Sequence, residues 1–251
     1  TATGMSIGPA IGSFLASAYG LDQMFYISSV FALASILILS RMKETLPPTM
    51  KSRLRLSLFR IGWKDVFEPK IIPVFWIMLF VSFSAGAMIT LIPDTSKIVG
   101  WTNKGLYFTI YTVSSIVIRF FFSKASDQYG RIPVLIFGCF MLSLSMFLLV
   151  FSANSYLMII SAIIYGVAWG FNTPTLAAWT NDLGDKNHMG RAMATMYIAL
   201  EAGIGIGAYV SGEIYQGIPN HIPIPFLIAG LLSLLAFLLL WKKKQAWTYG
   251  I

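Results

Sequence analysis

Charged residues are scarce in this sequence, and polar stretches are short. Of 251 residues, only 11% are charged, whereas 57% are apolar and 15% are aromatic. An ordinary soluble domain has about a quarter charged residues, enough to keep its surface in water. The composition therefore excludes a disordered segment and argues against a soluble globular enzyme.

Residues that commonly carry metal or covalent chemistry are also few. Cys139 is the single cysteine and lies in an apolar block, which rules out a disulfide framework and a cysteine metal site. The two histidines, His188 and His221, lie in separate loops. We find no histidine–glutamate metal spacing, nucleophile elbow or phosphate loop. We therefore predict no metal, no cofactor and no enzymatic activity.

The apolar residues gather in long blocks, each close to the roughly 20 residues that cross a bilayer as a helix. A spanning segment has to satisfy its own backbone polar groups, and barrel strands would be about half as long. We therefore predict an all-α polytopic membrane protein. The sequence begins at Thr1 inside an apolar stretch, and we expect further residues to precede it. The eight predicted spans are 1–19, 23–40, 72–92, 105–123, 132–152, 155–176, 190–211 and 222–241.

The net charge of +8 invites comparison with nucleic-acid-binding proteins, but its distribution argues against such a partner. Nearly all lysines and arginines lie in alternate loops, with eight of them in the connection 41–71. The opposite loops hold only Lys97 and Lys104. Because lysine and arginine concentrate on the cytoplasmic side of membrane proteins, we predict a multi-pass protein of the cell membrane with a cytoplasmic C-terminus.

The connection 41–71 has two interpretations. Apolar residues recur at helical spacing after Pro47-Pro48, which is typical of a short helix lying along the membrane surface. The alternative is a basic linker with a few apolar residues. In either case it separates two predicted spans from a block of six.

Small residues recur at helical spacing in the first and seventh predicted spans. In each case the pattern allows two helices to approach backbone to backbone, and in the first span Pro9 also bends the helix. The predicted packing residues are Gly4, Gly8, Pro9, Gly12, Gly203 and Gly207.

The short connection 123–131 contains an acid and a base four residues apart. Asp127 begins a tight turn, Gly130 can adopt a positive φ, and Arg131 opens the next span. Such a pair can hold a neighbouring helix end in one state and release it in another. The alternative is a solvated turn.

Taken together, these patterns resemble the major facilitator superfamily. Residues 4–12 resemble the fifth-helix motif of its drug:proton antiporters, and 123–131 resemble the loop motif between its eighth and ninth helices. On this register the chain covers helices five to twelve and lacks the first four. The resemblance divides it into the last two helices of an N-terminal half (1–40), a cytoplasmic loop between the halves (41–71) and a C-terminal six-helix half (72–251).

The resemblance implies alternating access, in which two six-helix halves rock around a site near the midplane of the membrane. It also implies a gate on the cytoplasmic side and a monomeric protein. The predicted gate residues are Arg119, Asp127, Gly130, Arg131 and Arg191. Arg119 is expected either to extend to the membrane surface or to join the Asp127 cluster.

Glu201 is the acidic residue that lies deepest in a predicted span. It follows Arg191 by ten residues, about 15 Å at helical rise, which places it near the bilayer centre. Charges at such depth are costly and are commonly functional, so Glu201 is our candidate for binding and releasing the coupling proton. The alternative is a structural carboxyl hydrogen-bonded to a neighbouring helix.

Polar and aromatic side chains in two predicted spans are candidates for a cavity lining. Their alternative role is ordinary hydrogen bonding between helices. The candidates are Tyr107, Tyr111, Ser114, Ser115, Trp169 and Asn172.

We therefore predict a secondary transporter that works in the lipid bilayer, most simply a proton-coupled exporter of small amphiphilic molecules. The alternative within this class is a proton-coupled importer or a facilitator of a sugar or other small solute. A sensor or assembly subunit would need a soluble effector domain; no segment of this sequence is long enough to form one, which leaves the residues expected to precede it as the place for such a domain.

Overall fold

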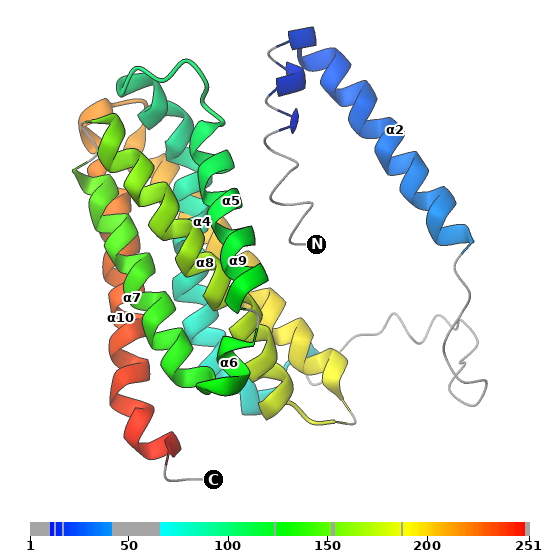
Figure 1. Cartoon of the computed structure of the whole chain (residues 1–251), viewed down its shortest axis with the longest axis vertical. Helices are drawn as coiled ribbons and strands as arrows, with labels where there is room; N and C mark the ends of the chain where they lie inside the picture. Colours follow the sequence, from blue (N-terminus) through cyan, green and yellow to red (C-terminus); the bar gives the residue numbers. More distant parts are fainter. Residues whose placement is uncertain are drawn as a thin grey trace.

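A computed structural model describes residues 11–12, 14–16, 18–41, 66–122, 124–151, 154–186 and 188–248. This part of the chain contains helices and no strand (Figure 1). The predicted packing residues Gly4, Gly8 and Pro9 lie outside it, as does most of the connection 41–71. The elements are α2 (Leu21–Ser40), η3 (Pro69–Ile71), α4 (Ile72–Ile98), α5 (Leu106–Phe122), α6 (Ala125–Gln128), α7 (Arg131–Val150), α8 (Ser155–Leu183), α9 (Met189–Tyr215), η4 (Pro219–His221) and α10 (Pro223–Thr248).

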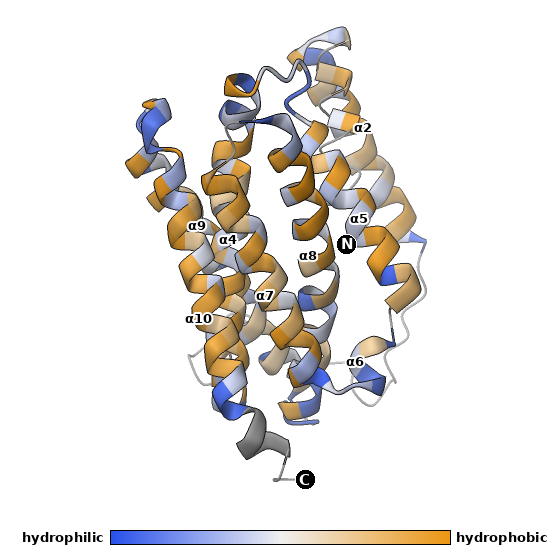
Figure 2. Ribbon diagram, turned by 60° about the vertical axis from the view of Figure 1, so that its left-hand side comes forward, coloured by the Kyte–Doolittle hydropathy of each residue, from blue (hydrophilic) through white to orange (hydrophobic). Residues whose placement is uncertain are grey.

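The all-α prediction is confirmed, and six helices of the described part are long and apolar enough to cross a membrane. They are α2, α4 with η3, α7, α8, α9 and η4 with α10. Helix α5 is also apolar but has 17 residues, about 26 Å at helical rise. Figure 2 shows hydrophobic residues along the middle of the helices and hydrophilic residues at both ends. The chain is therefore a multi-pass membrane protein.

Three of the predicted spans end six or seven residues before the corresponding helices do. Helix α4 continues through Pro93 to Ile98, and α8 continues through Pro174 to Leu183. A proline inside a helix removes one backbone hydrogen bond. In α4, Thr95 and Ser96 beyond the proline are buried, and we attribute the continuation of the helix to their packing. Helix α10 likewise continues beyond residue 241, where the predicted span ended, to Thr248.

Local signals explain where several helices begin. Asn154 precedes α8, and its side-chain oxygen accepts hydrogen bonds from the backbone N–H groups of Tyr156 and Leu157, at 2.7 and 3.3 Å. This satisfies donors that have no partner inside the helix. Gly130 precedes α7 with a φ of 88°, a conformation that favours glycine.

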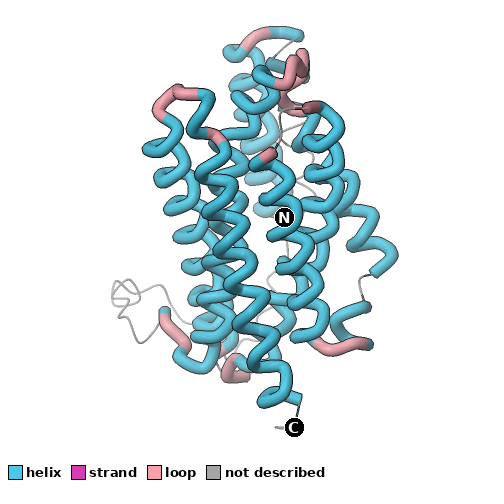
Figure 3. The backbone as a smooth tube through the Cα atoms, turned by 90° about the vertical axis from the view of Figure 1, so that its left-hand side faces the viewer, coloured by secondary structure: helices cyan, strands magenta, loops and turns pink. Residues whose placement is uncertain are grey.

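Helices α4 to α10 form one bundle (Figure 3). The axes of its long helices are nearly parallel, and loops join the helices at both ends of the bundle. Helix α4 packs against α9 and α10, α7 against α8 and α10, and α5 against α8. Helix α2 stands beside this bundle in Figure 1, and none of its residues is buried.

Glycines bring α4 and α9 into backbone contact. A Cβ atom added to Gly203 would lie 2.6 Å from the carbonyl oxygen of Leu79. Added to Gly207, it would overlap the carbonyl oxygen of Phe83, and added to Gly86, the carbonyl oxygen of Ile204. The contact therefore has no room for side chains at these three positions, in agreement with the packing role predicted for Gly203 and Gly207.

Candidate functional site

The outer face of α9 carries an exposed row of residues spaced four apart: Tyr197, Glu201, Gly205 and Tyr209. Tyr197 is 49% exposed and Tyr209 is 69% exposed. The opposite face of α9, which contains the buried Gly203, packs against α4. The row therefore points away from the bundle.

Glu201 lies at the middle of this row. It is the thirteenth of the 27 residues of α9, about 18 Å from the start of the helix and about 21 Å from its end at helical rise. Its side chain is exposed and makes no ion pair within the described part of the chain. A carboxyl group at mid-height on an outward face is accessible to whatever covers that face.

Aromatic rings connect α5 and α8. The ring of Tyr111 meets Tyr165 edge to face at 5.5 Å, and Tyr165 stacks on Trp169 at 5.9 Å with an interplanar angle of 11°. Tyr165 is 1% exposed, whereas Tyr111 and Trp169 are half-buried. Of these three rings, those of Tyr111 and Trp169 are therefore the ones that are partly exposed.

Three of the predicted lining residues lie inside the bundle. Tyr107 is fully buried, and its hydroxyl lies 3.1 Å from the Oγ atom of Ser161. Asn172 is fully buried against Gly138 of α7, and its amide atoms have no hydrogen-bond partner among the described residues. Ser115 is 2% exposed at the contact with α8. These three side chains contact neighbouring helices.

Ser114 is partly exposed, like Tyr111 and Trp169. Its Oγ donates a 2.9 Å hydrogen bond to the carbonyl oxygen of Ile110, one turn earlier, and the residue is half-buried. A Cβ added to Gly166 of α8 would lie 2.6 Å from the Cβ of Ser114. Ser114 therefore sits at the edge of the α5–α8 contact.

The connection between α5 and α7 forms a charged cluster with the end of α8. Arg131 donates hydrogen bonds to Asp127, to the Oγ of Ser126 at 2.8 Å and, through Nε, to Asp182 at 2.7 Å. Asp127 and Arg131 pair with each other, and Arg131 also binds Asp182, which lies 51 residues further along the chain. Sequence reasoning missed Asp182, whose signal was an acid ending the polar run Thr180–Asp182.

Arg119 does not belong to this cluster. It lies in the last turn of α5, and the ion pairs of the described residues do not include it. Its Nε is buried and has no hydrogen-bond partner in the described part of the chain.

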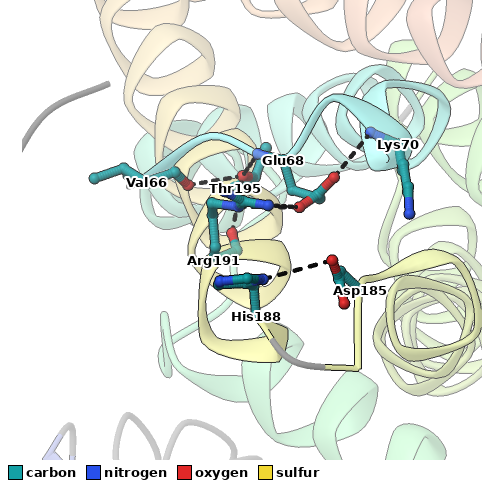
Figure 4. A network of polar contacts seen from close by, with 7 residues as sticks. All are labelled: Val66, Glu68, Lys70, Asp185, His188, Arg191 and Thr195. Carbon is teal, nitrogen blue, oxygen red and sulfur yellow. Dashed lines mark hydrogen bonds and ion pairs between the residues drawn. The ribbon is translucent and has the colours of Figure 1, made fainter. Parts of the chain in front are cut away.

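Arg191 belongs to a second network, which fastens the start of η3 to α9 (Figure 4). Its Nε and Nη2 donate to Oε2 of Glu68 at 3.0 and 2.5 Å. The Oγ1 atom of Thr195 accepts a 2.8 Å hydrogen bond from the backbone N–H of Glu68 and lies 2.9 Å from the carbonyl oxygen of Val66. Near the start of α9, His188 Nδ1 lies 3.5 Å from Asp185 Oδ2.

Glu68 is 3% exposed, and the Arg191 guanidinium that binds it holds the pKa of this carboxyl below its ordinary value, against the opposing effect of burial. Sequence reasoning missed Glu68 and Thr195. The available signal was an acidic residue directly before Pro69, in a connection otherwise rich in basic residues.

The described residues contain no group of three or more histidine, cysteine, aspartate or glutamate side chains able to hold a metal ion. The chemistry that the site offers is therefore that of a carboxyl group, aromatic rings and ion pairs.

Comparison with the sequences of known proteins shows the family of this chain. Residues 95–246 match the sequence profile of the Major Facilitator Superfamily, which is more than half of the chain. The chain belongs to this superfamily. It is 25% identical to an uncharacterized MFS-type transporter of Methanocaldococcus jannaschii over 175 residues, 68% of this chain and 45% of the relative. It is 24% identical to the quinolone resistance protein NorA of Staphylococcus aureus over 184 residues, 70% of this chain and 47% of the relative.

The chain thus spans about half the length of the curated relatives it matches. The superfamily match begins in the last turn of α4 and ends within α10, so it covers the bundle from α5 to α10.

Proposed function

We propose that this chain supplies the C-terminal half of a secondary transporter that works by alternating access. Residues 72–251 would form that half, 41–71 the connection between the halves, and 1–40 the end of an N-terminal half. The bundle of α4 to α10 supports this division, since its helices pack on one another while α2 buries none of its residues. An N-terminal half facing the outer side of α9 would enclose a cavity.

The observation that carries the proposal is the position of Glu201. Its carboxyl lies at mid-height on the face of α9 that the bundle leaves open, between Tyr197 and Gly205. Once the second half covers this face, a charged carboxyl is costly there, so proton binding and cavity closure become coupled. Glu201 is therefore the proposed proton carrier, and protons are the proposed coupling ion.

The proposed substrates are small amphiphilic molecules that leave the cell. Tyr111 and Trp169 present half-buried rings next to the α5–α8 contact, with the hydroxyl of Ser114 nearby. Aromatic faces bind flat apolar groups, and the tyrosine and tryptophan polar atoms bind the polar part of an amphiphile. We therefore restrict the proposed lining to these three residues and leave Tyr107, Ser115 and Asn172 to helix packing.

The charged clusters lie at one end of the bundle, which we propose to be cytoplasmic because the basic connections meet there. The cluster of Arg131, Asp127 and Asp182 joins the α5–α7 connection to the end of α8. The pair of Glu68 and Arg191 joins the entry to α4 with the start of α9. Both would hold the cytoplasmic ends in one state and rearrange in another.

The test is transport into everted membrane vesicles that contain the complete transporter, with a fluorescent quinolone as probe. We expect uptake that an uncoupler abolishes and that Glu201→Gln reduces at least tenfold. The matched control is Glu213→Gln, which removes an exposed carboxyl from the same helix nearer its end. Uptake that survives the uncoupler and is unchanged in Glu201→Gln would overturn the exporter proposal. Proton-driven accumulation in the opposite direction would favour an importer.

A further inference from the structure

A groove of about 440 Å³ lies between α4 and α10, and Glu201 is not among its lining residues. It occupies the end of the bundle where α4 begins and α10 ends (Figure 1). Its walls include Trp76 and Phe80 from α4 and Leu235, Leu239 and Lys243 from α10. Trp179 of α8, which is 5% exposed, also lines it. The groove has the size of a small-molecule binding site.

The lining is apolar along its whole length. Of the nine lining residues, Lys243 is the charged one, and it lies at the end of the groove. Along α10 the lining runs from Leu235 to Lys243, eight residues or about 12 Å at helical rise. An apolar groove of this length that ends at a cation is complementary to a hydrocarbon chain with an anionic head.

The surroundings of the groove's mouth are positive. Lys242 and Lys243 are exposed near the end of α10, and no acidic residue occurs in that helix. Lys70 is exposed one turn before the lining residue Pro73. Glu68, two residues before Lys70, is buried in its ion pair with Arg191. An anionic group at the mouth would therefore meet cations, and the carboxylate of Glu68 is already paired.

We propose that this groove binds one anionic phospholipid from the surrounding bilayer. One acyl chain lies along Leu239 and Leu235 toward Trp179, and the phosphate group lies at Lys243 and Lys242. The groove opens on the outside of α4 and α10, where Trp76 is 49% exposed and Leu235 is 41% exposed. In a multi-pass protein these side chains face lipid, so the ligand is present at high concentration beside the site. Basic residues at this depth attract anionic headgroups.

Other occupants fit these features less well. A soluble phosphate would use the lysines but leave the apolar walls uncovered. A second copy of α10, which carries no acidic residue, would cover the apolar walls but leave the lysines without an anion. A neutral phospholipid would use the walls but not the charge.

The test is native mass spectrometry of the complete transporter released from detergent, titrated with phosphatidylglycerol, phosphatidylcholine or glycerol 3-phosphate. We expect one phosphatidylglycerol molecule to be retained in preference to phosphatidylcholine. The double variant Lys242→Gln/Lys243→Gln should weaken phosphatidylglycerol binding about 25-fold, on the basis of about fivefold for each lysine. The matched control Lys124→Gln/Lys186→Gln removes two cations from other loops and should leave binding unchanged.

A second variant separates the acyl chain from the headgroup. Leu239→Trp fills the groove while keeping both lysines, and it should reduce retention of both phospholipids. Leu235→Trp serves the same purpose if the first variant fails to give a single species on size exclusion. Equal retention of the two phospholipids by the unmodified protein would overturn the proposal, as would equal losses in the two lysine double variants. Competition by glycerol 3-phosphate would indicate a phosphate site instead, and dimers lost in Leu239→Trp would indicate a contact between copies.

Discussion

Arg191 binds a single carboxylate oxygen of Glu68 through two of its nitrogens, although the two residues are 123 positions apart in the sequence. Together with Thr195, this pair fastens the chain segment that enters α4 to the first turns of α9. The contact reinforces the glycine-mediated packing of the same two helices further along their length. It thus fixes the position at which the connection between the proposed halves reaches the bundle.

The Glu68–Arg191 pair makes stability depend on pH. The folded protein holds the pKa of Glu68 below its ordinary value of 4.5, so the unfolded chain binds the proton more readily. The stabilisation is therefore present above pH 4.5 and is lost as the pH falls through the lower, folded-state value. We expect Glu68→Gln to lower the free energy of unfolding by about 1–3 kcal/mol at pH 7. Denaturant titration in detergent at pH 7 measures this loss.

The same variant should lose less stability than the unmodified protein when the pH falls below 4.5, because it has no carboxyl at this position to protonate. Glu213→Gln, at an exposed position of α9, is the control and should follow the unmodified protein. Parallel pH profiles for Glu68→Gln and the unmodified protein would contradict a role for this pair in stability.

Thr195 is the second element of the same contact. It is fully buried, and its hydroxyl oxygen accepts from the Glu68 backbone and lies within hydrogen-bonding distance of two carbonyl oxygens. Thr195→Val keeps the shape but leaves the Glu68 N–H without its acceptor, and we expect a loss of about 1–3 kcal/mol in the free energy of unfolding. Thr195→Ser should restore most of it. Equal losses in the valine and serine variants would show that the methyl group, not the hydroxyl, matters.

The succession of helices was predictable because each spanning segment is a local property: an apolar run of the required length, bounded by charge or turn residues. The Glu68–Arg191 and Arg131–Asp182 pairs were not, since periodicity carries no information on contacts between distant segments. Glu68 lies in a connection that is otherwise rich in lysine and arginine, which indicates the orientation of the loop but not a partner for a carboxylate. Its role depends on where the start of α9 comes to lie.

The candidate lining shows a second limit. Tyr107 and Tyr111 share one face of α5, and their spacing indicated a polar face without indicating what it meets. The structure buries Tyr107 against Ser161, whereas Tyr111 remains half-buried beside Tyr165. A hydrogen bond between helices and a wall of a cavity require the same residue types in a membrane, so the sequence pattern is common to both.

The α4–α9 contact predicts that alanine substitutions at two glycines of α9 change the free energy of unfolding differently. A methyl group at Gly207 would overlap the backbone of Phe83, and helix backbones cannot yield as a flexible side chain does. We expect Gly207→Ala to lower the free energy of unfolding by about 1–3 kcal/mol. Gly212 has no atom within 4 Å of an added Cβ, so Gly212→Ala should instead be neutral or stabilise by up to about 1 kcal/mol through helix propensity.

Thermal unfolding of both glycine variants in the same detergent measures this difference. A Gly207→Ala protein as stable as the unmodified one would show that α4 and α9 do not approach as closely as described.

Arg131 reaches three acceptors at once through two nitrogens of its planar guanidinium. Its Nε binds Asp182, and a second nitrogen binds Asp127 and Ser126. Lysine keeps the charge but lacks this fork, so Arg131→Lys tests geometry rather than charge. Both acids are about half exposed or more, which limits each ion pair to about 1 kcal/mol or less. If the cluster holds one state of the transport cycle, Arg131→Lys should change the initial transport rate in everted vesicles by about two- to fivefold. Lys124→Arg, at the start of the same connection, should leave the rate unchanged, and equal rates in all three proteins would assign the cluster to the stability of the loop alone.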